Sequence, residues 1–175
     1  FINRSVKGDL SFRNIIIISL LLPFRRLFFY LFNPILLFIT KYLTWFILFC
    51  IGSEPNLVAR SIFISGSELV ISDGCGGTDN LYFAIASLVI YKMIFSIKRY
   101  KNLISMYALV LLIPILTNSI RNTILALIIT LNINIRDKMF SFFHDSYGSL
   151  IFSLISLLII SYLYFKLLDK ELNLK

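Results

Sequence analysis

The sequence has few charged side chains. Asp, Glu, Lys and Arg make up 15% of its 175 residues, whereas hydrophobic residues make up 58% and the mean hydropathy is +0.87. A soluble domain is about 45–50% apolar, so the core of a chain of this length cannot enclose all the apolar side chains. Lipid must cover the rest, and the composition therefore predicts an integral membrane protein.

Residues that build metal sites and nucleic-acid surfaces are also scarce. One His and two distant Cys do not supply the ligands of a zinc site. The net charge is +8, but Lys and Arg cluster at the ends of apolar runs and not on one polar face. The sequence contains no GxSxG, HExxH or Walker motif. It has no signal-peptide cleavage site, and it opens on Phe1, as a processed protein or a fragment would. We expect no metal, no cofactor and no nucleic-acid partner.

Long apolar runs are what the sequence has instead. A helix needs about 20 apolar residues to cross a bilayer, and Asn14–Phe24 falls short of that. The run Leu27–Gly52 is long enough but contains Pro34 and Lys41, so a spanning and an interfacial position both fit. Further membrane segments are predicted at Asn80–Ile97 (with Thr78 or Asp79 as its cap), Leu103–Leu116, Ile124–Ile133 and Tyr147–Leu168.

Residues 52–80 differ from the rest, because their five charged side chains sum to −3. Within them, "SIFISGSELVIS" alternates around Gly66 and predicts a β-hairpin at about residues 60–73. The loop "KRYK" carries a charge of +3, so the positive-inside rule places this loop in the cytoplasm and the hairpin outside. The last predicted span ends near lysines, which places its end in the cytoplasm and its start, near His144, outside as well. The sequence predicts one membrane domain over residues 1–175, an all-α polytopic bundle with a small extracytoplasmic β-hairpin.

Cys75 lies in "SDGCGGTDN", about one turn before a predicted helix. The helix dipole and the free backbone N–H groups at that end stabilise a thiolate. The neighbouring glycines permit unusual backbone angles and the close approach of a substrate chain: Gly74, Gly76 and Gly77. A turn with a small buried residue is the alternative. Cys50, by contrast, lies inside an apolar run and is expected in the core.

Two other polar residues complete a candidate site. Arg121 lies in the apolar stretch "LTNSIRNTILAL", with Asn118 on the same helical face. A charge at membrane depth costs roughly 2.5–3.5 kcal/mol, so Arg121 faces protein or water, unless it snorkels to the outer headgroups. His144 heads "HDSYGSLIF", in which Gly148 lets a neighbouring helix approach. A nucleophile, an oxyanion donor and a proton shuttle are what acyl transfer from a peptide needs.

At these residues the sequence resembles the exosortase/archaeosortase family of multi-spanning membrane transpeptidases. The motifs that carry the resemblance are "ISDGCGG" after the hairpin, "PILTNSIR" from Pro114 to Arg121, and "HDSYGSLIF", in the family's order through residues 55–165. The segment "PFRRLFFYLFNPILLFITKYLTWFILFCIG" also looks like the family's Pro-led, partly interfacial helix. Gly76 stands where the family commonly has Ser, and the chain is short at its amino end.

The resemblance implies a membrane cysteine transpeptidase with Cys75 as nucleophile and Arg121 and His144 as its partners, supported by Asn118, Gly77 and Gly148. It further implies exported protein substrates with a C-terminal sorting tail, a surface acceptor, and an active site on the extracytoplasmic side of the inner or plasma membrane. The alternative is a non-catalytic membrane subunit of a surface-polymer export or assembly system, in which Arg121 is a structural or ligand charge.

Overall fold

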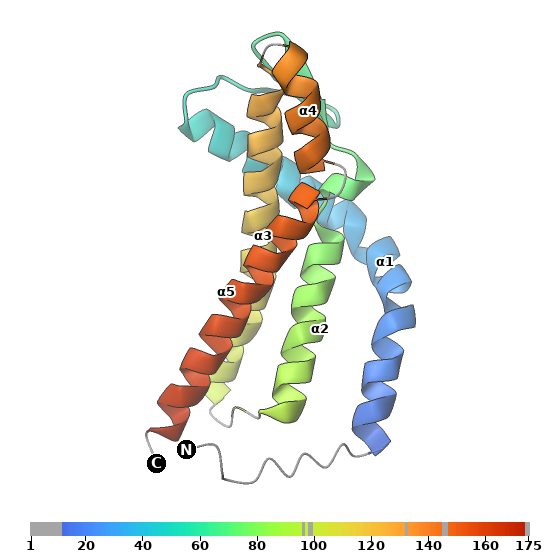
Figure 1. The fold of residues 1–175 in the computed structure, drawn as a ribbon, viewed down its shortest axis with the longest axis vertical. Coiled ribbons are helices and arrows are strands. Elements are labelled where there is room, and N and C mark those ends of the chain that lie inside the picture. Colours follow the sequence, from blue (N-terminus) through green and yellow to red (C-terminus); the bar gives the residue numbers. More distant parts are fainter. Residues whose placement is uncertain (1–11, 96, 98–99, 132, 145–146, 174–175) are drawn as a thin grey trace.

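The protein is a bundle of helices with a small sheet (Figure 1). The computed structural model describes residues 12–95, 97, 100–131, 133–144 and 147–173. Its helices are α1 Phe12–Cys50, α2 Thr78–Ile94, α3 Tyr100–Ile128, α4 Ile133–His144 and α5 Tyr147–Leu172. The predicted all-α membrane fold with a small β element is confirmed.

Helix α1 is one continuous helix where the sequence suggested two separate apolar segments. Figure 1 shows that it changes direction along its length, and that its later half crosses behind α3. The helix contains Pro23 and Pro34, and each proline removes one helical hydrogen bond, which bends a helix. Among the described residues, three segments are long and apolar enough to cross a membrane: Pro23–Cys50, Asn102–Ile128 and Tyr147–Leu172.

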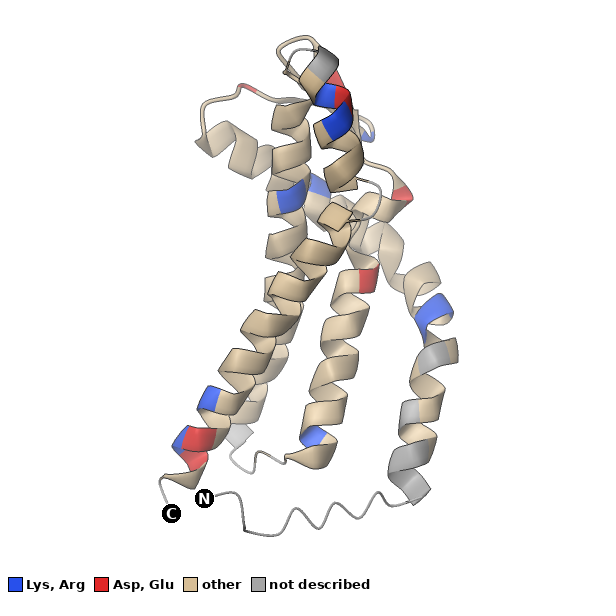
Figure 2. Cartoon of the chain, viewed as in Figure 1, with Lys and Arg blue, Asp and Glu red and all other residues tan. Residues whose placement is uncertain are grey.

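Helices α2, α3 and α5 run side by side and share an apolar core (Figure 1). Buried residues from all three helices form this core: Ala84, Leu88, Met106, Val110, Ile160 and Tyr164. Charged residues gather toward the two ends of these helices, while their middle parts are uncharged (Figure 2). The outward faces carry exposed apolar side chains such as Leu112, Leu154 and Leu158, as lipid contact requires.

The sheet has three antiparallel strands in the order β1–β2–β3. The predicted hairpin is β2 Ser61–Ile64 and β3 Ser67–Val70, joined at Ser65 and Gly66, which both have positive φ as a two-residue hairpin turn requires. Strand β1, Asn56–Val58, is an addition that the sequence did not indicate. The inner face of the sheet packs against the end of α1 and against α3 through Ile62, Ile64, Leu69, Ile71, Leu48 and Leu125.

Two expectations about helices need correction, and one helix was missed. Helix α2 starts after Gly77, which is in the left-handed region, and no side chain caps it, so the predicted cap at Thr78 or Asp79 is wrong. The two apolar segments predicted at 103–116 and 124–133 are largely one helix, α3, because the polar residues between them face protein. The short helix α4 was not predicted. The basic residues Lys98 and Arg99 lie outside the described part.

The expectation for Cys50 is also wrong. Cys50 is the last residue of α1 and its side chain is exposed. An apolar run in a membrane protein includes lipid-facing positions, so an apolar context does not by itself imply burial inside the protein.

Candidate active site

Cys75 is positioned by the short 3₁₀ helix η1, Asp73–Cys75, which follows β3. Its N–H donates to the Ser72 carbonyl oxygen at 2.8 Å, and its Sγ lies 3.4 Å from the Ser72 Oγ. The side chain is only 2% exposed and belongs to the apolar cluster under the sheet. A substrate carbonyl can therefore reach the sulfur only after the groups covering it move.

Two amides of α3 hold the backbone of Cys75. The Nδ2 atoms of Asn118 and Asn122 donate to the Cys75 carbonyl oxygen at 2.6 and 3.0 Å, and both side chains are buried. Asn122 was missed, although its spacing of four from Asn118 puts it on the same face of an apolar helix. Gly77 lets Asn118 approach, because a Cβ at Gly77 would lie 2.6 Å from the Asn118 Nδ2. The amide pair thus fixes η1 against α3.

Arg121 lies between these two amides in the sequence and also reaches η1. Its Nη2 donates to the Gly74 carbonyl oxygen at 3.5 Å, and the residue is 5% exposed. Within the described residues, its Nε has no hydrogen-bond partner. Arg121 lines a cavity of about 70 Å³, which we call the Arg121 cavity, with residues from η1, α2, α3 and α5 that include Asp73, Gly74, Asn118, Ser149 and Ser153.

His144 is the last residue of α4, and its ring stacks on Phe140 at a centroid distance of 5.0 Å. It lines a different and larger cavity of about 720 Å³ between the hairpin turn and α4, which we call the His144 cavity. In Figure 1, α4 ends and α5 begins beside the segment that leads into α2. The structure thus brings Cys75, Asn118 and Arg121 together, and places His144 on the wall of another cavity.

Gly148 allows the close approach that the sequence suggested. A Cβ at Gly148 would lie 2.4 Å from the Phe143 Cα, so the beginning of α5 packs directly on the end of α4. Phe140 and Phe143 of α4 in turn pack against the apolar cluster that contains Cys75. Helix α4 therefore packs over the apolar cluster to which Cys75 belongs.

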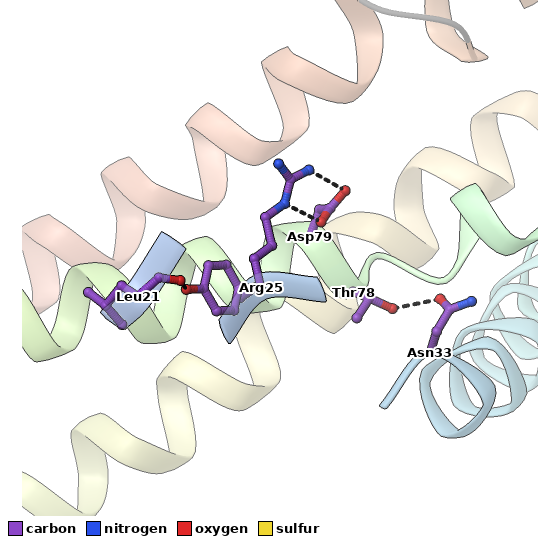
Figure 3. A network of polar contacts seen from close by, with 6 residues as sticks. Leu21, Arg25, Asn33, Thr78 and Asp79 are labelled. Atoms are coloured by element: carbon purple, nitrogen blue, oxygen red, sulfur yellow. Dashed lines mark hydrogen bonds and ion pairs between the residues drawn. The ribbon is translucent and has the colours of Figure 1, made fainter. Parts of the chain in front are cut away.

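A second polar network, not found from the sequence, ties α1 to the start of α2 (Figure 3). Arg25 donates through two nitrogens to the Asp79 carboxylate at 2.9 and 3.0 Å, and Thr78 Oγ1 donates to Asn33 Oδ1 at 2.7 Å. The Tyr82 hydroxyl donates to the Leu21 carbonyl oxygen. The network holds α1 beside the segment that carries Cys75.

The same contacts explain why a glycine follows Cys75. A Cβ at Gly76 would lie 2.8 Å from the Asn33 Oδ1 and 3.2 Å from the Leu37 Cγ. The Gly76 carbonyl oxygen also accepts a hydrogen bond from Thr40 Oγ1 at 3.2 Å. A serine here, which the resemblance would lead one to expect, would require the Asn33 or Leu37 side chain to shift.

Comparison with known proteins gives one family. A family model described as transmembrane exosortase matches residues 8–161, which include Cys75, Arg121 and His144. No curated protein and no solved structure matches the chain.

Proposed function

The chain belongs to the transmembrane exosortase family, and from that premise we propose that it cleaves the C-terminal sorting tail of exported proteins and passes the acyl group to a surface acceptor. The family match supports a multi-pass membrane protein with transpeptidase-type function in general. The finer proposal is that Cys75 is the nucleophile, Arg121 stabilises the oxyanion and His144 moves the proton.

The reaction would proceed through a thioester. His144 takes the Cys75 thiol proton, and the thiolate attacks the carbonyl carbon of the scissile peptide bond, forming a C–S bond and an oxyanion that Arg121 stabilises. When the intermediate collapses, the C–N bond breaks and the leaving amine takes the proton from His144. A nucleophile of the acceptor then attacks the thioester, gives its proton to His144 and regenerates the Cys75 thiolate.

One observation carries this proposal: a buried guanidinium within α3 reaches the backbone next to Cys75. The two asparagines that grip the Cys75 carbonyl hold the cysteine in place beside it. His144 lines the neighbouring cavity, so in this mechanism the end of α4 moves toward Cys75 as the substrate displaces Phe140 and Phe143.

An extracytoplasmic site is favoured by the charges. Lys92, Lys166 and Lys170 lie near the ends of α2 and α5 that are remote from η1, and the positive-inside rule puts these ends in the cytoplasm. Cys75 would then face the side on which exported proteins emerge.

The test is the substitution Cys75→Ala with Cys50→Ala as its matched control. Each variant is co-expressed with an epitope-tagged exported protein that carries a C-terminal sorting tail, and uncut and cut forms are separated on a gel. We expect Cys75→Ala to abolish cleavage and Cys50→Ala, at the exposed end of α1, to leave it unchanged, with equal membrane insertion. Normal cleavage by Cys75→Ala would remove the nucleophile assignment.

The burial of Cys75 favours a second candidate, the non-catalytic subunit in which this cysteine only fills the apolar cluster. The two candidates differ in one covalent product. A transpeptidase forms an enzyme–substrate thioester, which hydroxylamine cleaves and which Cys75→Ala cannot form. A subunit without activity forms no such adduct with the tail-bearing protein and leaves its tail intact.

A further inference from the structure

Within the described residues, strand β3 has one edge that no other strand pairs with, and the register shows which of its residues face that edge. The Ile71 N–H donates to the Arg60 carbonyl oxygen at 2.9 Å, so residues 71, 69 and 67 direct their backbone groups toward β2. In an antiparallel pair the residues between them point the other way. The N–H and C=O groups of Glu68 and Val70 therefore face outward, and both residues are exposed.

This edge lies beside open space and leads to the candidate site. The His144 cavity is bounded by the beginning of β3, including Glu68, and by residues of α4. After Val70 the chain continues through Ile71 and Ser72 into η1, where Asp73 and Gly74 line the Arg121 cavity. The free edge of β3 therefore runs from one cavity toward the other, with Cys75 just beyond its end.

We propose that the substrate segment before the scissile bond binds in extended form along β3 and adds a fourth strand to the sheet. The inference rests on the proposed function and names its peptide-binding subsite. Unpaired edge groups at alternate residues are the template for such strand addition, which gives affinity through the main chain and selectivity through pockets for alternate side chains.

The His144 cavity supplies the side-chain pockets in this arrangement. Its wall is mixed, with apolar Ile129 and Phe140 next to the charged groups of Glu68, Arg136 and Asp137. Side chains of an extended strand alternate between two faces, so every second substrate residue would contact this wall. We therefore expect the His144 cavity to recognise a short substrate segment through two side chains that are separated by one residue.

Proline scanning tests the edge directly. Glu68→Pro removes the outward N–H without breaking a backbone hydrogen bond to β2. Glu68→Ala loses the same side-chain hydrogen bond from Ser61 Oγ to Glu68 Oε1 but keeps the N–H, so the ratio of the two cleavage rates isolates the effect of the N–H. We expect cleavage of the tagged, tail-bearing protein at limiting substrate to be about fivefold to tenfold lower with Pro than with Ala, the effect of one lost hydrogen bond. The matched control is Leu57 on the opposite edge, whose N–H also points outward: Leu57→Pro should equal Leu57→Ala.

Hydrogen exchange gives a second measurement in case a proline variant does not insert. With Cys75→Ala enzyme and uncut tail-bearing protein, the Glu68 and Val70 amides should exchange at least tenfold more slowly than without it, while the paired Leu69 amide changes little. Equal cleavage by Glu68→Pro and Glu68→Ala, or unchanged exchange at both amides, overturns the strand addition and leaves the proposed function standing. Absence of any cleavage by the unaltered chain contradicts the proposed function itself.

Discussion

Burying a guanidinium within an apolar helix costs free energy, and other interactions must offset that cost. Arg121 is 5% exposed, yet its one described hydrogen bond is long, at 3.5 Å, and its Nε has no partner among the described residues. Buried polar groups with a purely structural role are usually fully hydrogen-bonded. The spare donor capacity of Arg121, next to Cys75, fits a group that binds a substrate oxygen as negative charge develops there.

Arg121→Lys tests this role. An ammonium keeps the charge but lacks the planar set of donors, so we expect cleavage of a tail-bearing protein to fall at least 100-fold, in line with the loss of an oxyanion donor. The loss should appear as a slower turnover at saturating substrate. The same change at Arg60, which is exposed on the sheet, is the control and should alter cleavage less than twofold. Full activity of Arg121→Lys would contradict an oxyanion role.

At the level of single residues, the sequence drew attention to polar side chains that stand within apolar stretches. Asn118 and Arg121 are polar in an apolar helix, and both contact η1. The sequence could not reveal which apolar residues face lipid, and Cys50 was misplaced for that reason. Nor could it show that α1 packs so tightly on Gly76, since that contact joins residues about 40 positions apart.

At the scale of elements, polar contacts join α1 and α2. Such contacts matter in a membrane, because the hydrophobic effect contributes little to the association of helices that are surrounded by lipid. Arg25 and Asp79 are about half exposed, and Asp79 follows Gly77 by two residues and Cys75 by four. The contact therefore positions the start of α2 against α1 as well as stabilising the pair of helices.

A charge reversal checks that contact. Asp79→Arg places two cations together and also puts a cation at the N-terminal end of α2, so we expect the melting temperature in detergent to fall by a few degrees, about 2–4 °C per kcal/mol lost. Adding Arg25→Asp should recover part of the loss, because the pair is restored but the helix dipole still opposes Arg at position 79. No recovery in the double variant, compared by thermal unfolding of the purified protein, would show that the ion pair contributes nothing.

The sequence predicted some helices and strands more accurately than others, and the difference has physical reasons. The hairpin and α5 have clear apolar patterns and were expected close to their observed bounds. Helix α3 was expected as two pieces, because the sequence cannot show that the polar residues near Arg121 face protein instead of ending the helix. Strand β1 and helix α4 depend on packing against the rest of the fold, and their short sequences carry little signal of their own.

At the scale of the whole molecule, the two ends of the bundle differ in what they carry. One end holds the sheet, η1, α4 and both cavities, and the other holds the ends of α2 and α5 with Lys92, Lys166 and Lys170. This polarity matters for function, because a transpeptidase for exported proteins must present its nucleophile on the side that they reach.

Cysteine labelling on intact cells tests the orientation. In a background with Cys50→Ala and Cys75→Ala, Ser65→Cys at the hairpin turn and Lys170→Cys near the end of α5 each provide a single exposed thiol at opposite ends. If the lysine-bearing end is cytoplasmic, a membrane-impermeant maleimide should label Ser65→Cys from outside, and Lys170→Cys only after the membrane is permeabilised. The reverse pattern would put the candidate site in the cytoplasm, where no exported tail could reach Cys75, and the proposed function would then fail for the molecule as a whole.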